Sequence, residues 1–234
     1  MITFGICVGS DYIDFDSENL RKIIASINNT AGYNTHEILL IGNRQYCRYS
    51  YGQVFCEPIN CFTRNAWITC KKNSITDLAL FDIIVYSHDY FIYHEDFYEN
   101  VICSDPFDIA VPRILNPDGS RWRDKISWGN PAYPPAWIQH EPWTGTGMYH
   151  EGQPRMEPYD REIPRDYWFV NGSFWIARKS TMRKYPLNER LIWGEAEDCE
   201  WSFRFRKDKS INLKYIDTEV YLLKQKDNVF LYAN

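Results

Sequence analysis

The chain has 234 residues, a net charge of −5 and 44% hydrophobic residues. This length and composition predict a single domain over residues 1–234 with a substantial core. The negative charge excludes a general nucleic-acid binder, and no run of about 18 apolar residues is present that would span a membrane.

The first half of the chain alternates between strand-like and helix-like segments. We expect strands at 2–8, 37–41, 54–59 and 83–86, because these runs are apolar and rich in β-branched residues. A helix is predicted from Asp16 or Ser17 up to Gly32, with its apolar residues on one face. A second, short helix is predicted to follow Ser74, which would cap it. This order predicts a parallel α/β sheet, in which ligands bind beyond the carboxyl ends of the strands.

The second half has a different character. Residues 104–166 are rich in Pro, Gly, Trp and Arg and show little periodicity, so we expect a folded excursion with short strands that forms one wall of a cleft. Regular structure resumes with a strand at 167–177 that is interrupted at Asn171 and Gly172. A helix at 197–206 and strands at 213–216 and 220–223 are expected to follow.

The most informative segment is Trp193–Arg204, which reads W-G-E-A-E-D-C-E-W-S-F-R. Four carboxylates gather after the Trp-Gly pair, at Glu195, Glu197, Asp198 and Glu200. Carboxylates packed this closely raise one another's pKa, which suits a general base. The alternative is an acidic first helical turn, in which the side chains interact favourably with the helix dipole. The spacing alone does not decide between them.

Two further clusters are candidates for binding phosphate. Asp89 follows the strand at 83–86 and is placed either to hold a divalent cation or to bond the backbone of its loop. Lys71, Lys72 and Asn73 are expected in a loop before the second helix, where they can contact phosphate or a base. No glycine-rich dinucleotide or P-loop motif is present.

Taken in order, these segments resemble glycosyltransferases of the GT-A fold that use nucleotide sugars, of the family-2 and galactosyltransferase-like kind. The resemblance rests on K-K-N-S-I at Lys71–Ile75, I-V-Y-S-H-D-Y at Ile84–Tyr90, N-G-S-F-W-I-A-R-K at Asn171–Lys179 and the Trp193–Arg204 block. It covers about residues 1–206. It implies one GT-A-like domain with a Rossmann-like, mixed, mostly parallel central sheet flanked by helices. Residues 1–103 would form the nucleotide-sugar half and residues 104–234 the acceptor-binding and catalytic half.

The resemblance also implies roles for individual residues. Asp198 would be the catalytic base, Glu197 would orient the acceptor sugar, and Asp89 would meet a divalent metal, Mn²⁺ or Mg²⁺. The acceptor side would be formed by Asn171, Gly172, Trp193 and Gly194. The nucleotide would be held by Val8, Gly9, Ser10, Asn43, Lys72, Asn73, Ser87 and His88.

The sequence departs from the family's pattern at two points. Ser87 stands where relatives carry the first Asp of D-x-D, and no histidine follows His150 that would act as the late metal ligand. The resemblance therefore supports metal dependence less strongly than it supports the sugar-transfer reaction. A residue of the C-terminal stretch is the alternative candidate for the missing metal ligand.

The reaction implied is a single displacement that transfers a sugar from a nucleoside diphosphate sugar, UDP-sugar first, to an acceptor hydroxyl of a glycan, with inversion. A retaining outcome stays open. The competing interpretations are a nucleotidyltransferase and a non-catalytic carbohydrate-binding protein that uses the nine tryptophans.

The N-terminus and the cysteines are the basis for predicting the cellular compartment of the protein. The chain starts with a strand-like run and lacks a basic n-region, and its seven cysteines include no C-x-x-C pair. We therefore expect free thiols, a reducing compartment and a cytoplasmic protein.

Overall fold

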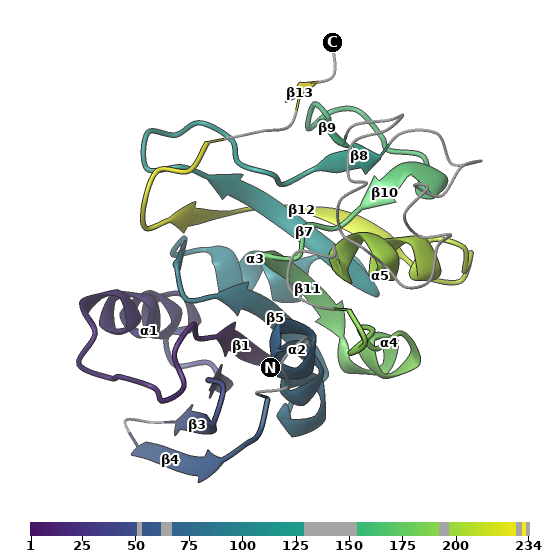
Figure 1. Ribbon diagram of the computed structural model, residues 1–234. Helices are drawn as coiled ribbons and strands as arrows, with labels where there is room; N and C mark the ends of the chain where they lie inside the picture. Colours follow the sequence, from purple (N-terminus) through teal and green to yellow (C-terminus); the bar gives the residue numbers. More distant parts are fainter. Residues whose placement is uncertain (51–52, 62–66, 129–153, 192–196, 228–230, 233–234) are drawn as a thin grey trace.

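The computed structural model describes residues 1–50, 53–61, 67–128, 154–191, 197–227 and 231–232 (Figure 1). Its helices are α1 (Glu18–Ala31), α2 (Trp67–Leu78), α3 (Phe97–Cys103), α4 (Lys179–Lys184) and α5 (Glu197–Phe205). Its strands are β1 (Ile2–Cys7), β2 (His36–Ile41), β3 (Gln45–Ser50), β4 (Gln53–Pro58), β5 (Ile83–His88), β6 (Phe91–Tyr93), β7 (Ile109–Leu115), β8 (Ile126–Trp128), β9 (Pro154–Met156), β10 (Trp168–Phe169), β11 (Phe174–Arg178), β12 (Leu213–Leu222) and β13 (Leu231–Tyr232).

A nine-stranded sheet runs through the molecule in the order β4-β3-β2-β1-β5-β11-β7-β12-β6. Among the described strands, six of these nine run in the same direction, because only β3, β11 and β6 are reversed. The expected α/β class with a mixed, mostly parallel sheet is therefore confirmed. Strands from both 1–103 and 104–234 share this sheet, while the division into two functional halves stays a prediction. A smaller sheet has the order β10-β8-β9-β13.

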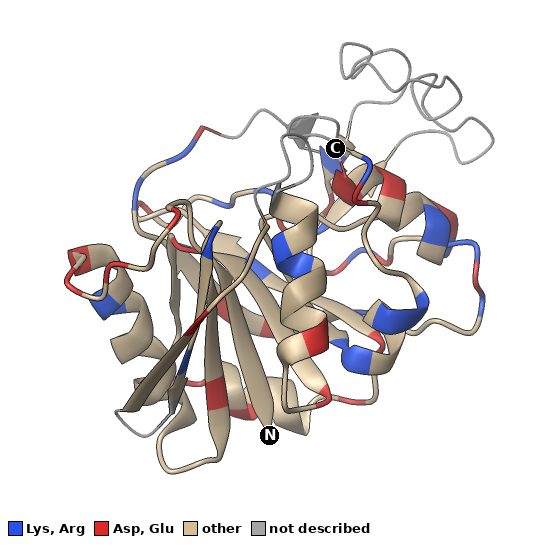
Figure 2. Cartoon of the chain, turned by 60° about the horizontal axis from the view of Figure 1, so that its bottom comes forward, with Lys and Arg blue, Asp and Glu red and all other residues tan. Residues whose placement is uncertain are grey.

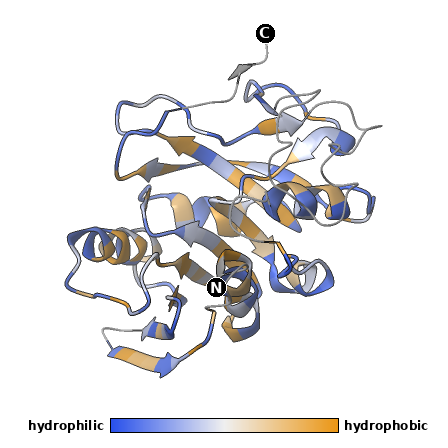
Figure 3. Ribbon diagram, viewed as in Figure 1, coloured by the Kyte–Doolittle hydropathy of each residue, from blue (hydrophilic) through white to orange (hydrophobic). Residues whose placement is uncertain are grey.

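Each face of the large sheet buries its own apolar cluster. Alternate residues of β1 show why: Ile2, Phe4 and Ile6 join the cluster under α1 and α3, and Cys7 joins the cluster under α2, α4 and α5. Figures 1 and 3 show the helices on both faces of the sheet, with apolar residues along the central strands. Gly5 lets α2 approach closely, since a Cβ at this position would lie 2.3 Å from Ile75.

Several predicted elements are confirmed and one boundary is wrong. Helix α1 begins after Ser17 and ends before Gly32, as expected. Helix α2, by contrast, begins at Trp67 and includes Ser74, which was expected to precede it. Lys71, Lys72 and Asn73 are therefore helical residues and not part of a loop. The expected strands at 213–216 and 220–223 form one strand, β12, whose register with β7 shifts between Tyr215 and Glu219.

The expectation of a folded excursion with short strands over 104–166 agrees with β8 and β9 but is wrong for β7, which belongs to the large sheet. Strand β7 lies inside the sheet between β11 and β12, although its sequence I-A-V-P-R-I-L contains Pro112. A proline lacks the N–H that a central strand donates. Here Pro112 lies opposite the register shift in β12: Val111 pairs with Tyr215 and Arg113 with Glu219, so Pro112 itself has no paired residue in β12. Residues 129–153 of this segment lie outside the described residues.

The expectation of seven free thiols is also wrong, because Cys47 and Cys56 form a disulfide. They lie directly opposite each other on β3 and β4, an antiparallel pair. The sequence indicated only the second of these two strands, so the hairpin that brings the cysteines together was not predicted. The expected reducing compartment rested on free thiols and loses that support.

Acidic and basic side chains are interspersed over the described chain, and neither sign dominates it (Figure 2). Within the described residues, none of the helices combines the length and the apolar character needed to cross a membrane.

Candidate active site

The carboxyl ends of β1 and β5 form one side of a cavity of about 470 Å³, which we call the donor cavity. The carboxylate of Asp89, just after β5, accepts a hydrogen bond of 3.0 Å from the backbone N–H of Gly9, just after β1. Val8, Ser10 and Asp89 all line the cavity. The structure thus brings together four residues that the sequence assigned to nucleotide and metal binding.

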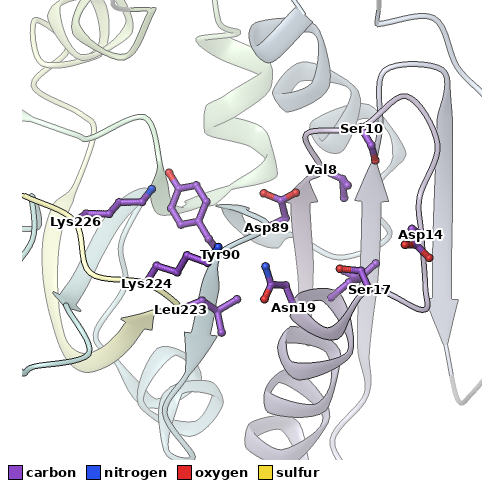
Figure 4. A pocket seen from close by; sticks show the side chains of 11 residues that line it. Val8, Ser10, Asp14, Ser17, Asn19, Asp89, Tyr90, Leu223, Lys224 and Lys226 are labelled. Carbon is purple, nitrogen blue, oxygen red and sulfur yellow. The ribbon is translucent and has the colours of Figure 1, made fainter.

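The opposite side of the donor cavity comes from the end of β12 and the segment after it. Tyr90, Leu223, Lys224 and Lys226 line this side. The backbone N–H of Leu223 donates to the carbonyl of Tyr90 over 2.9 Å, which fixes the segment beside Asp89. In Figure 4 the ring of Tyr90 lies between the ammonium group of Lys226 and the carboxylate of Asp89.

Three predicted nucleotide contacts are used elsewhere in the structure. Ser87 faces the core, where its hydroxyl accepts a 2.9 Å hydrogen bond from Tyr93, because side chains alternate along β5. The side chain of Asn73 points to another loop and donates to the carbonyl of Leu187 and the carboxylate of Glu189. Lys72 also turns away from the donor cavity and belongs to the site described next.

Asn43 lies next to the loop that follows β1. Its side-chain amide donates to Asp11 over 2.7 Å, and its backbone N–H donates to the carbonyl of Ser10 over 3.0 Å. Its side-chain oxygen is buried and has no hydrogen-bond partner among the described residues. Burying an oxygen without a partner costs free energy, so this atom is a candidate acceptor for a ligand group.

Glu197 and Asp198 begin α5 and, with Gly172 and Lys72, form what we call the carboxylate site. The carboxylate of Asp198 accepts hydrogen bonds from the backbone N–H of Gly172 over 2.7 Å and from that of Cys199 over 2.8 Å. A Cβ on Gly172 would lie 3.0 Å from both Asp198 and Glu197. The turn that carries Gly172 therefore needs a glycine so that α5 can approach it this closely.

The second carboxylate of this site is neutralised by a buried lysine. Lys72 donates to Glu197 over 2.7 Å, and the two side chains are 1% and 14% exposed. The ammonium group of Lys72 also lies 4.9 Å from the centre of the Trp175 ring. This ion pair joins α2 to α5 across 125 residues of sequence and supplies the buried ammonium group of Lys72 with an opposite charge.

The environment of Asp198 raises the pKa of its carboxyl group to about 6. Burial of the group is the main cause, and the charge of Glu197 adds to it, while Lys72 and the two backbone hydrogen bonds oppose it. A carboxyl group with this pKa is largely ionised at neutral pH and is a better proton acceptor than an ordinary aspartate. The clustered acidic residues thus supply more than a favourable first helical turn.

The donor cavity and the carboxylate site meet at the end of β5. The backbone N–H of His88 donates to the carbonyl of Ser173, one residue after Gly172. Burial, helped by Lys72, lowers the pKa of His88 to about 3, so its ring is neutral. Burial raises the pKa of the Cys7 thiol, at the end of the neighbouring strand β1, to about 11.

The remaining predicted acceptor residues have different outcomes. The side chain of Asn171 bonds two backbone groups, donating to the carbonyl of Arg123 over 3.0 Å and accepting from the N–H of Ser173 over 3.1 Å. It therefore shapes the turn that presents Gly172. Trp193 and Gly194 lie outside the described residues.

The residues near Asp89 provide few ligands for a metal ion. In the described part of the chain, no three His, Cys, Asp or Glu side chains gather closely enough to hold one. A single carboxylate fits Mg²⁺ or Mn²⁺ only where phosphate oxygens and water complete the coordination, as they do in many phosphate-binding enzymes. Asp89 alone would therefore need such additional ligands to hold a metal ion.

No protein-family model matches the chain, and no curated protein matches its sequence. Among solved structures, one match is S. aureus TarS 1–349, with 9% identity and a TM-score of 0.48 over 96% of this chain and 58% of that one. Another is GalNAc-T7 with UDP, GalNAc and Mn²⁺, with 11% identity and a TM-score of 0.47 over 97% of this chain and 43% of that one. The chain thus spans about half the length of these two structures. The strand order by itself places the chain in the α/β class with a mixed, mostly parallel sheet, as the sequence resemblance implies.

Proposed function

We propose that this chain transfers a sugar from a nucleoside diphosphate sugar, UDP-sugar in the first instance, to a hydroxyl group of a glycan, with inversion at the anomeric carbon. The observation that carries the proposal is the state of Asp198. Its carboxylate is held by two backbone N–H groups, and burial raises its pKa to about 6.

The chemistry asked of Asp198 is proton removal from the acceptor hydroxyl while that oxygen attacks the anomeric carbon. Each carboxylate oxygen has two lone pairs, so the backbone hydrogen bonds leave acceptor capacity on both oxygens. A base of this kind contributes on the order of 10²–10⁴-fold to the rate. Glu197 is fixed by Lys72 beside Asp198, which supports a role in orienting the acceptor.

The donor would occupy the donor cavity, with its diphosphate next to Asp89. A divalent metal bound there would neutralise negative charge on the departing diphosphate. The protein's own contribution is the position of Asp89, which the backbone N–H of Gly9 fixes over 3.0 Å. The buried oxygen of Asn43, which has no partner among the described residues, supports a contact to the nucleoside.

The proposal is tested by incubating the protein with a panel of nucleoside diphosphate sugars and mixed glycan acceptors, UDP-sugars first. We expect release of the nucleoside diphosphate together with a glycosylated product. NMR of that product should show the anomeric configuration opposite to that of the donor. Retention of configuration would contradict the inverting mechanism, and transfer of a nucleotidyl group in place of the sugar would contradict the proposed reaction class.

A further inference from the structure

A second cavity, of about 390 Å³, lies at the opposite end of β12 from the donor cavity. Lys125, Arg165 and Lys214 line it, and we call it the basic cavity. Leu213, the first residue of β12, lines this cavity, whereas Leu223, just after the strand, lines the donor cavity. Strand β12 has 10 residues, so its two ends lie about 30 Å apart. Among the described residues, none lines both cavities.

The ammonium group of Lys125 is buried and bound to backbone carbonyls. Lys125 is 5% exposed, and its ammonium group donates to the carbonyl of Tyr159 over 2.9 Å and to that of Arg161. These two bonds fix its position at the wall of the cavity. An ammonium group has three N–H donors, so one donor is left for a ligand.

The carboxylates nearest to Lys125 are paired with arginines. Asp124 accepts from Arg121 over 2.6 Å, and Glu157 accepts from Arg161 over 3.1 Å. Burial and the charge of Arg121 lower the pKa of Lys125, although nearby carboxylates oppose them. A buried cation of this kind is stabilised by an anion that binds directly beside it.

Arg165 adds a second cation that is held by carbonyls. Its guanidinium group donates to the carbonyl of Asp208 over 2.8 Å and to that of Ile211. A guanidinium group has five N–H donors, so three remain for a ligand. The third cation, Lys214, has a partner in Asp105 over 2.8 Å, but this carboxylate is 91% exposed and the pair is therefore weak.

The charge and the size of the basic cavity both favour a phosphate ligand. Among the described residues, no carboxylate lies within ion-pair distance of Lys125 or Arg165. Two such cations match a phosphate monoester, which carries nearly two negative charges at neutral pH, better than a singly charged carboxylate. The volume of about 390 Å³ is that of a small-molecule site.

We propose that the basic cavity is a second ligand site, which binds a phosphate group, free or as the monoester of a small molecule, through Lys125 and Arg165. A planar guanidinium group and an ammonium group are the side chains that bind phosphate oxygens most strongly. The inference goes beyond the proposed function and does not depend on it, because the donor cavity is formed by other residues.

The test is an NMR titration of the full chain with inorganic phosphate, glucose 6-phosphate and glucose. The reporter is the indole N–H of Trp168, which lines the basic cavity and donates to the carbonyl of Ile163 over 2.9 Å. The variant Trp168→Phe assigns this signal. We expect both phosphates to shift it saturably, with a Kd below about 5 mM, and glucose to leave it in place. The shift should persist in saturating UDP.

The ratio of the two phosphate affinities identifies the form of the ligand. Tighter binding of glucose 6-phosphate than of inorganic phosphate supports a monoester, and equal binding supports free phosphate.

Variants of the cavity residues test the assignment. Arg165→Gln and Lys125→Met should each weaken phosphate binding at least about tenfold, and Arg165→Lys, which keeps the charge, should weaken it less than Arg165→Gln. Glu162→Gln removes an exposed carboxylate from the rim and should strengthen binding about twofold. Lys209→Met is the matched control, because Lys209 is exposed and lies outside the cavity. It should change the affinity less than twofold.

Four results would overturn the proposal. One is the absence of a saturable shift of the Trp168 signal with either phosphate, and another is an equal shift with glucose. The third is displacement of the phosphates by UDP, which would place them in the donor cavity. The fourth is unchanged affinity in Arg165→Gln, which keeps the test decisive if Lys125→Met does not fold.

Discussion

The carboxylate site and the donor cavity differ in how their charges are balanced. Asp198 accepts two backbone hydrogen bonds and Glu197 is paired with Lys72, so each carboxylate has partners within the protein. In the donor cavity, Lys226 rests on an aromatic ring and has no carboxylate in ion-pair distance among the described residues. The first arrangement suits a neutral hydroxyl that gives up a proton, and the second suits an incoming anion.

The largest expected effect tests whether the carboxylate site depends on its internal pairing. Lys72→Met leaves Glu197 charged and mostly buried without its partner, which should lower the free energy of unfolding by about 3 kcal/mol. Adding Glu197→Gln should recover much of that loss. Chemical denaturation measures both. The control is Lys184→Met, which breaks the more exposed pair with Asp208 and should cost less than about 1 kcal/mol. Equal losses for Lys72→Met and Lys184→Met would contradict the pairing.

The next largest expected effect is the increase in UDP affinity that a metal at the donor cavity would cause. If Asp89 is the protein ligand of a divalent metal, Mn²⁺ should raise the affinity of wild type for UDP at least about tenfold, and Asp89→Ala should abolish that gain. Asp14→Ala is the matched control, because Asp14 lines the same cavity but is exposed. Calorimetric titration of UDP with and without Mn²⁺ provides the readout. If the UDP affinity of Asp89→Ala rises with Mn²⁺ as much as that of wild type, Asp89 is not the metal ligand.

A pair of glycines sharpens the comparison further. A Cβ at Gly172 would lie 3.0 Å from the two carboxylate side chains, whereas a Cβ at Gly9 would meet Asp89 at an ordinary 3.8 Å. Gly172→Ala should therefore displace Asp198 and lower kcat about tenfold or more, with UDP affinity retained. Gly9→Ala should leave kcat within about threefold. Steady-state kinetics and UDP titration distinguish the two variants. A larger loss of kcat in Gly9→Ala than in Gly172→Ala would contradict the assignment of proton removal to the carboxylate site.

The smallest effect is a shift in pH dependence. Glu197 raises the pKa of Asp198, so Glu197→Gln should move the acidic limb of the kcat/KM profile to lower pH. The sign follows from the loss of a neighbouring negative charge, which makes the carboxylate form easier to reach. A limb that stays in place or moves to higher pH would show that another group controls it.

Elements with a clear apolar period could be predicted from the sequence, and elements defined by tertiary contacts could not. Helix α1 could be predicted because its sequence has a capping residue at Ser17, apolar residues at helical spacing and a terminating glycine at Gly32. Strand β7 contains Pro112, which argues against a central strand unless a register shift in the neighbouring strand is known. The β3–β4 hairpin was missed because its first strand, β3, was not predicted: of residues 45–49 only Cys47 is buried, so this strand has no apolar run.

The candidate active site shows the same difference between residues that a local sequence pattern indicates and residues that tertiary contacts define. Asp198 and Asp89 could be found because each follows a recognisable segment, the Trp-Gly pair and a buried strand. The role of Lys72 depends on its pairing with Glu197, 125 residues away, and no local signal indicates it. Lys226 carries even less signal, since it is placed by Asn116 from a distance of 110 residues.

The most direct test of the central claim is the pH dependence of sugar transfer in wild type and in Asp198→Asn, with UDP affinity measured in parallel. The raised pKa predicts that wild-type kcat/KM increases with pH through about 6, as the carboxylate form of Asp198 becomes populated. Asp198→Asn should lose on the order of 10²–10⁴-fold in rate, lose this limb and bind UDP like wild type. An asparagine variant that keeps the limb near pH 6, or transfers sugar within tenfold of wild type, would contradict the assignment of Asp198 as the base.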